Sequence, residues 1–218
     1  MVSYEHKIRN IYLGANTLPL WYQEVEYIES SGTQWIDTWF AYTKTTGKVE
    51  TKFSSTAFGS QYHSYRLWGS YNSASPTSRS FILYVNYSTL RLWLWTGDIN
   101  TNRSLSTNTI YELTEEISTP WTCQVTINGT STSHNYSGTI ATNKNFYIFC
   151  NNETGTPWSY GRDKLYYLKL YEEGTLVRDF IPCYRTADDV IWLYDKVNDV
   201  FYTNSWTWTF TKWPDVWN

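Results

Sequence analysis

Short stretches of alternating apolar and polar residues run along the whole chain, and their period is that of β-strands. Strict alternation, which places neighbouring side chains on opposite faces of a sheet, occurs at residues 23–28, 48–53 and 122–127. More continuous apolar runs, typical of strands covered on both faces, occur at residues 81–85, 90–95, 146–150 and 164–171. No segment shows the period of a helix of three turns. The pattern therefore predicts an all-β protein.

Turn-forming residues separate these stretches at intervals of about ten residues. Many of the turns combine glycine with a small or polar residue, as in Ser31-Gly32 and Glu173-Gly174. Asn128-Gly129 is the strongest hairpin signal, because a two-residue type I′ turn needs a positive φ at both positions. Short strands and polar turns at this spacing predict a two-sheet sandwich or a barrel. A short helical turn is expected at most around residues 111–113.

The composition of the 218 residues agrees with a β-rich globular protein and excludes several other classes. Aromatic residues make up 19% and charged residues 17%, a mixture that argues against disorder, coiled coils and helical bundles. The formal net charge of −3 gives no electrostatic basis for binding nucleic acid or an anionic membrane. No apolar run reaches the roughly 18 residues that a membrane span needs. We therefore expect neither a nucleic-acid partner nor membrane insertion.

Three cysteines, Cys123, Cys150 and Cys183, each lie inside an apolar or aromatic run. We interpret them as small buried side chains, because free cysteine is among the most buried residue types. The three histidines are far apart in sequence and form no metal-ligand pair. A calcium site would need a denser cluster of acidic and amide side chains than Asp188-Asp189 provides. The sequence thus predicts no metal, no other cofactor and maturation in a reducing compartment.

Blocks near both ends of the chain resemble segments that recur in phage tail and other virion-associated proteins. The blocks are LPLWYQEVEYIESSGTQWIDT (residues 18–38), GTLVRDFIPC (174–183), VIWLYD (190–195), FYTN (201–204) and TFTK (209–212). They bracket a domain similar to the concanavalin A-like, LamG-type jelly roll. This resemblance implies a two-sheet antiparallel sandwich whose terminal strands pair. We therefore expect a short N-terminal arm at residues 1–18 and a jelly-roll domain at residues 19–218.

The resemblance also implies a function, that of a non-enzymatic phage virion component such as a tail, fibre or capsid-surface protein. Its expected partners are other virion proteins, further copies of this chain and host-surface glycans, and its expected location is the virion. The alternative is a carbohydrate-binding module of a bacterial surface or secreted protein. A glycoside hydrolase is a minor alternative, because Glu24, Glu26 and Glu29 match the acidic spacing of laminarinase-like glucanases. A regular strand would separate Glu29 from the other two, so no catalytic residue is expected.

Glycan binding would use aromatic faces for the sugar rings, with amide, carboxylate or guanidinium groups nearby for the hydroxyls. The candidate ligand-binding residues are Tyr65, Trp68, Trp158, Tyr160 and Arg162. The last three follow residues 151–155, a polar segment suited to ligand contact. Trp68 has an alternative role in core packing. Trp93 and Trp95 alternate with leucines, so either a subunit contact or a ligand would cover them.

Tryptophan stands at several positions where the resembling proteins usually carry glycine. These positions are Trp21, Trp39, Trp192, Trp206, Trp208, Trp213 and Trp217. Glycine often supplies a positive φ, a conformation that costs a bulky residue roughly 1–2 kcal/mol. Two interpretations stay open. Either the turns have ordinary backbone geometry and tryptophan is a surface feature, or the source reads as glycine a codon that was translated as tryptophan.

Overall fold

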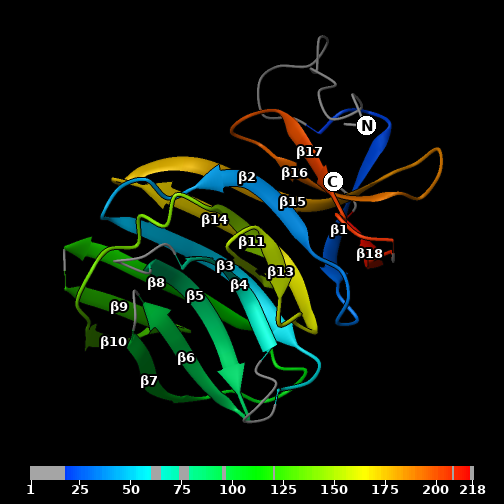
Figure 1. The fold of residues 1–218 in the computed structure, drawn as a ribbon. Helices are drawn as coiled ribbons and strands as arrows, with labels where there is room; N and C mark the ends of the chain where they lie inside the picture. Colours follow the sequence, from blue (N-terminus) through cyan, green and yellow to red (C-terminus); the bar gives the residue numbers. More distant parts are fainter. Residues whose placement is uncertain are drawn as a thin grey trace.

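The structure is a computed structural model that describes residues 18–59, 65–73, 79–94, 97–119, 121–207 and 209–216. Within these ranges every regular element is a β-strand, and no helix there is long and apolar enough to cross a membrane. The strands form two sheets that lie face to face (Figure 1). This arrangement confirms the predicted all-β, two-sheet jelly-roll sandwich.

The larger sheet has ten strands, and they include strands from the family-like blocks near both ends of the chain. Its strands, in spatial order, are β10 (Thr130–Asn135), β9 (Thr122–Ile127), β8 (Tyr111–Thr119), β3 (Gly47–Ser55), β14 (Asp163–Glu172), β1 (Tyr22–Glu29), β15 (Thr175–Arg185), β16 (Ile191–Asp195) and β17 (Val200–Thr203), with β18 (Thr211–Asp215) paired to β1. The antiparallel pairing of β1 with β18 places Tyr27 opposite Trp213. The first and last strands therefore pair, as predicted.

The smaller sheet has eight strands and carries the site described below. Its main path is β13 (Thr156–Trp158), β12 (Asn151–Glu153), β4 (Tyr65–Asn72), β5 (Arg79–Asn86), β6 (Thr89–Leu94) and β7 (Gly97–Ser104), while β11 (Asn145–Ile148) pairs with both β4 and β2 (Ile36–Ala41). All of these pairings are antiparallel except that of β12 with β4. The parallel pairing brings the polar residues of β12 beside β4.

The core between the sheets follows from the two-residue period of the strands. On β5 the side chains of Phe81, Leu83 and Val85 belong to the main core, whereas those of Ile82 and Tyr84 alternate with them and face outward. From the other sheet, Phe53 meets Trp68 edge to face at a centroid distance of 6.3 Å. Aromatic contacts of this kind stabilise the packing of one sheet on the other.

Two local predictions have opposite outcomes. The Asn128-Gly129 hairpin is confirmed: the two residues have φ values of 46° and 77° and connect β9 to β10 in register. The helical turn expected around residues 111–113 is wrong, because this segment begins β8. β8 pairs with β3 on one side and with β9 on the other. Residues 111–113 therefore continue the strand formed by the residues that follow them.

The three cysteines are free and buried, as the sequence predicts. Cys183 belongs to a small aromatic cluster at the β15–β16–β17 end of the larger sheet, separate from the main core. Leu18 packs against this cluster, so the domain begins at least one residue before the predicted boundary. The rest of the predicted arm, residues 1–17, lies outside the described residues.

Most of the tryptophans at glycine-like positions have ordinary backbone geometry. Of the five in the described ranges, only Trp39 has a positive φ, 50°, and its N–H donates to Asp37 Oδ1 at 2.8 Å. Trp192 is packed edge to face on Phe201. Trp208 and Trp217 lie outside the described residues. A positive φ is therefore found at one of these five positions, which agrees with the interpretation that most of these turns have ordinary backbone geometry.

Candidate functional site

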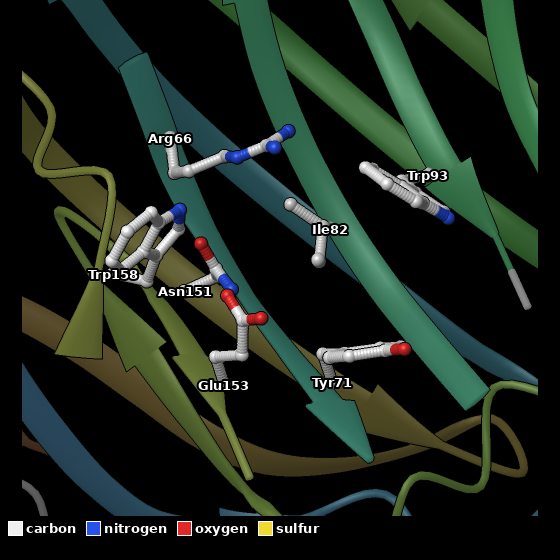
Figure 2. Close-up of a pocket in the computed structure, with 7 residues that line it drawn as sticks. All are labelled: Arg66, Tyr71, Ile82, Trp93, Asn151, Glu153 and Trp158. Atoms are coloured by element: carbon white, nitrogen blue, oxygen red, sulfur yellow. The ribbon is translucent and has the colours of Figure 1, made fainter. Parts of the chain in front are cut away.

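A pocket of about 210 Å³ opens on the outer face of the smaller sheet (Figure 2). It is lined by Arg66, Tyr71, Ile82, Trp93, Asn151, Glu153 and Trp158. These side chains come from five neighbouring strands, β4, β5, β6, β12 and β13. Trp93 and Trp158 stand on opposite sides of the pocket, and Arg66, Ile82 and Asn151 lie between them (Figure 2).

The floor and one wall of the pocket follow directly from strand alternation. Ile82 on β5 and Trp93 on β6 are cross-strand partners, and each is flanked by residues whose side chains are buried in the core. Gly69 on β4 is the partner of Ile82 on the other side. It has a φ of 151°, and a Cβ there would lie 2.7 Å from Ile82 Cα. Glycine therefore permits the close approach of β4 and β5 beneath the pocket.

A bulge in β4 decides which of its side chains reach the pocket. The register shifts between Arg66 and Trp68, so that Leu67 and Trp68 both enter the core while Arg66 lines the outer face. Trp68 is only 1% exposed. The prediction that Trp68 binds a ligand is therefore wrong. Trp68 packs in the core, which was the alternative role given above.

The second wall is the short hairpin of β12 and β13. Asn151 and Trp158 are opposite each other in this antiparallel pair, so their side chains share a face. Trp158 is 59% exposed. The side chain of Asn152 points to the opposite face and donates to the Asn145 carbonyl oxygen at 2.9 Å, which connects the hairpin to β11. The wall is thus an exposed indole on a supported hairpin.

Arg66 is the most unusual group in the pocket, because its guanidinium is buried, forms no ion pair within 4.0 Å among the described residues and has two nitrogens without a hydrogen-bond acceptor. The residue is 8% exposed, and neither Nε nor Nη1 has a hydrogen-bond partner. Its Cζ lies 4.1 Å from the centroid of the Tyr84 ring and 5.7 Å from that of Trp93. Burial lowers the pKa of Arg66 from its usual value, but an arginine keeps its charge at neutral pH. Aromatic faces hold this cation in place.

The carboxylate of Asp98, near the Arg66 cation, is hydrogen-bonded to other side chains. Asp98 accepts two hydrogen bonds from Arg91, from Nε at 3.1 Å and Nη2 at 2.6 Å, and one from the Tyr84 hydroxyl at 2.6 Å. Burial and this bond to Asp98 raise the pKa of Tyr84 to about 12. Asp98 therefore orients the aromatic support of Arg66 without pairing with Arg66 itself.

Of the four remaining sequence candidates, one lines the pocket and three do not. Trp158 is part of the wall, whereas Tyr65, Tyr160 and Arg162 are not among the lining residues. Tyr160 forms an isolated parallel bridge with Arg66. The Arg162 guanidinium lies over the Tyr65 ring at 5.9 Å. These three residues support the end of β4 from which Arg66 projects.

Sequence reasoning selected Trp158, left Trp93 undecided and did not select the other five lining residues, among them Ile82. Arg66 and Tyr71 precede and follow the bulge in β4, which has no local signature. Asn151 and Glu153 were recognised only as part of a polar segment, and the parallel pairing of β12 with β4 places them at the site. The position of Trp93 between two buried leucines is a signal that could have selected it, whereas Tyr71 has only one fully buried neighbour, Ser70.

Other sites considered from the sequence have less support. Glu24 and Glu26 lie on β1 of the larger sheet, and neither lines the pocket; burial raises the pKa of Glu24. In the part of the chain that the structure describes, no three acidic, histidine or cysteine side chains are grouped as metal ligands. A second hollow of about 300 Å³ includes Trp206 and Asp189. There, however, Asp189 already pairs with Lys212 at 3.5 Å.

No protein-family model matches the chain, and no curated protein matches it. Solved structures do resemble it. A Bacteroides ovatus protein described as a candidate carbohydrate binder has a TM-score of 0.59 and 11% identity, covering 87% of this chain and 60% of its own length. The CBM40 domain of the Ruminococcus gnavus IT-sialidase has a TM-score of 0.51 and 13% identity, covering 69% of this chain and 90% of its own.

The same CBM40 domain bound to α2,3-sialyllactose has a TM-score of 0.52 and 13% identity, covering 72% of this chain and 92% of its own. Identities this low show a shared fold and no more. The chain thus has the jelly-roll fold of lectin-like, carbohydrate-binding domains. The Bacteroides ovatus protein is longer, and this chain spans 60% of it.

Proposed function

We propose that this protein binds carbohydrate in the pocket on the outer face of the smaller sheet. The observation that carries the proposal is the pair of indoles, Trp93 and Trp158, on opposite sides of a cavity that also contains buried polar atoms without partners. Soluble proteins rarely expose large aromatic side chains together without a use for them. The similar solved structures support this function, since one is a CBM40 domain bound to α2,3-sialyllactose and another is described as a candidate carbohydrate-binding protein.

The chemistry of the lining residues suits a sugar. Indole faces pack against the apolar C–H faces of a pyranose ring, while its hydroxyls need acceptors and donors. Asn151 offers its Oδ1, which is buried without a hydrogen-bond partner, and Glu153 offers an exposed carboxylate. The cavity of about 210 Å³ is smaller than the roughly 300–1,000 Å³ of sites that enclose drug-sized ligands. We infer that one or two sugar units are bound, with the rest of a glycan outside.

The test is glycan binding by the wild-type protein and by variants with one tryptophan shortened. Glycan-array screening followed by calorimetry should find a ligand, and Trp158→Ala should weaken its binding by about tenfold or more. Trp93→Ala should act in the same direction. Trp213→Ala is the matched control, because Trp213 is 63% exposed but lies on β18 of the other sheet. Equal affinity in all four proteins would contradict the proposal.

The setting of this binding activity is a separate proposal. The sequence blocks at the chain ends favour a phage virion, where the protein would contact host glycans. The proposed virion location and virion partners depend on those blocks alone. The similar structures support the other alternative, a carbohydrate-binding module. They also agree with a binding role rather than glycoside hydrolysis.

A further inference from the structure

The buried guanidinium of Arg66 indicates which chemical group of the ligand binds in this pocket. Arginine side chains are seldom buried without an acidic partner, yet Arg66 is 8% exposed and both Nε and Nη1 lack a hydrogen-bond acceptor. It lines the pocket itself. An acceptor that enters the pocket would therefore meet an unpaired cation.

Neither carboxylate near the pocket fills this role. Asp98 is occupied by Arg91 and by the hydroxyl of Tyr84. Glu153 also lines the pocket, but among the described residues no ion pair within 4.0 Å includes Arg66. In Figure 2, Asn151 lies between Arg66 and Glu153. The positive and negative groups therefore mark two different parts of the pocket.

We propose that the glycan recognised here is an acidic one, with a sugar carboxylate bound to Arg66 between the indoles of Trp93 and Trp158. This inference rests on the proposed carbohydrate-binding function. A carboxylate forms charge-assisted hydrogen bonds with a guanidinium that are roughly twice as strong as neutral ones. A hydroxyl of a neutral sugar would satisfy the same N–H groups without compensating the charge.

The carboxylate of Glu153 determines which ligand groups can bind at its end of the pocket. A second negative group on the ligand would be repelled at that end of the pocket, whereas a sugar hydroxyl could donate to Glu153. We therefore infer a ligand with a single carboxylate near Arg66 and neutral hydroxyls toward Glu153. A terminal acidic sugar on an otherwise neutral glycan meets this description better than a polymer of uronic acids.

The first experiment varies the ligand and leaves the protein unchanged. Calorimetry compares acidic glycans with their matched neutral counterparts: sialyllactose with lactose, and a methyl glucuronide with both its methyl ester and the methyl glucoside. At least one acidic member should bind about tenfold or more tightly than its neutral partner, and added salt should reduce that preference. Sulfated sugars serve as a second anionic arm, and carboxylated glycans should bind more tightly than they do.

The second experiment removes the charge from the site. Arg66→Gln should bring the affinity ratio of acidic to neutral glycan close to one, while Arg66→Lys should retain part of the preference. Arg103→Gln is the matched control, since Arg103 lies on β7 of the same sheet, does not line the pocket and donates from Nη2 to the Thr130 carbonyl oxygen at 2.8 Å. Thermal melts establish that each variant is folded, and the ligand comparison on the wild-type protein decides the question if Arg66→Gln is not.

The outcomes separate this inference from the proposed function. Equal binding of acidic and neutral glycans, lost in Trp158→Ala, would overturn the acidic specificity and leave carbohydrate binding in place. A preference for sulfated over carboxylated sugars would overturn the choice of a carboxylate. Absence of binding to every glycan on the array and in these pairs would overturn both proposals.

Discussion

Replacing Glu115 by glutamine should change the way in which the stability of this protein depends on pH. Glu115 lies on β8 and points between the sheets, where it is 0% exposed and neither carboxyl oxygen has a hydrogen-bond partner. Burial raises its pKa to about 8, and the indole N–H of Trp68 opposes that rise only in part. Trp68 Nε1 itself makes no hydrogen bond of good geometry. The core thus contains a carboxylic acid that keeps its proton at neutral pH.

The magnitude follows from the two pKa values. In the unfolded chain a glutamate has its ordinary pKa of 4.5, so between pH 4.5 and pH 8 the folded protein holds a proton that the unfolded chain has released. Rising pH therefore favours the unfolded state throughout this window. The effect is about 1.4 kcal/mol for each pH unit, so from pH 5 to pH 8 the free energy of unfolding falls by about 3–4 kcal/mol through Glu115 alone. Glutamine has no such proton and removes this dependence.

The assay is urea-induced unfolding of the wild-type protein and of Glu115→Gln at pH 5, 6, 7 and 8. The free energy of unfolding of the variant minus that of the wild type should increase by about 3–4 kcal/mol across this range, with similar m-values in the two proteins. Glu116→Gln is the control, because Glu116 is the next residue and faces away from the core. It measures the effect of the same substitution on the outer side of the strand. A constant difference between Glu115→Gln and the wild type from pH 5 to pH 8 would refute the reasoning.

Two further predictions concern the strands beneath the pocket and the N-terminal segment. Gly69→Ala should lower stability by about 2–4 kcal/mol, because a Cβ would lie 2.7 Å from Ile82 Cα and the residue has a φ of 151°. In thermal melts it should be more harmful than Gly129→Ala, where a Cβ has open space; equal effects would contradict the argument. Deleting residues 1–17 should leave the melting temperature nearly unchanged and weaken assembly in light scattering, because we expect the N-terminal arm to contact a neighbouring subunit or a carrier. A large loss of stability in the monomer would contradict that prediction.

The sequence was sufficient to predict the fold because the evidence for strands is local. Alternation identifies which residues of β9 face the core, and Asn128-Gly129 determines a turn through its own backbone preferences. The pairing of β1 with β18 came from the resemblance of the two end blocks. Each of these features depends on a few neighbouring residues or on a recognisable segment.

The site depends on features that are not local. A one-residue bulge moves Trp68 into the core and leaves Arg66 on the outer face, and the sequence of β4 does not reveal it. The parallel pairing of β12 with β4 joins residues about 80 positions apart. Trp158 was found because an exposed aromatic in a polar loop is visible in the sequence. Its partner Trp93 was left undecided, because alternation shows that a side chain faces outward and not what lies against it.

Arg66 and Glu115 show two different solutions to the problem of a buried ionisable group without a partner. Glu115 avoids a buried charge by taking up a proton, and burial raises its pKa to about 8. Arginine cannot do the same at neutral pH, so Arg66 remains a cation whose Nε and Nη1 lack acceptors. The two groups also differ in position: Glu115 lies between the sheets, whereas Arg66 lines an open pocket. Only Arg66 can therefore be neutralised by a molecule from solution, and a ligand carboxylate that does so should stabilise the folded protein in proportion to its binding.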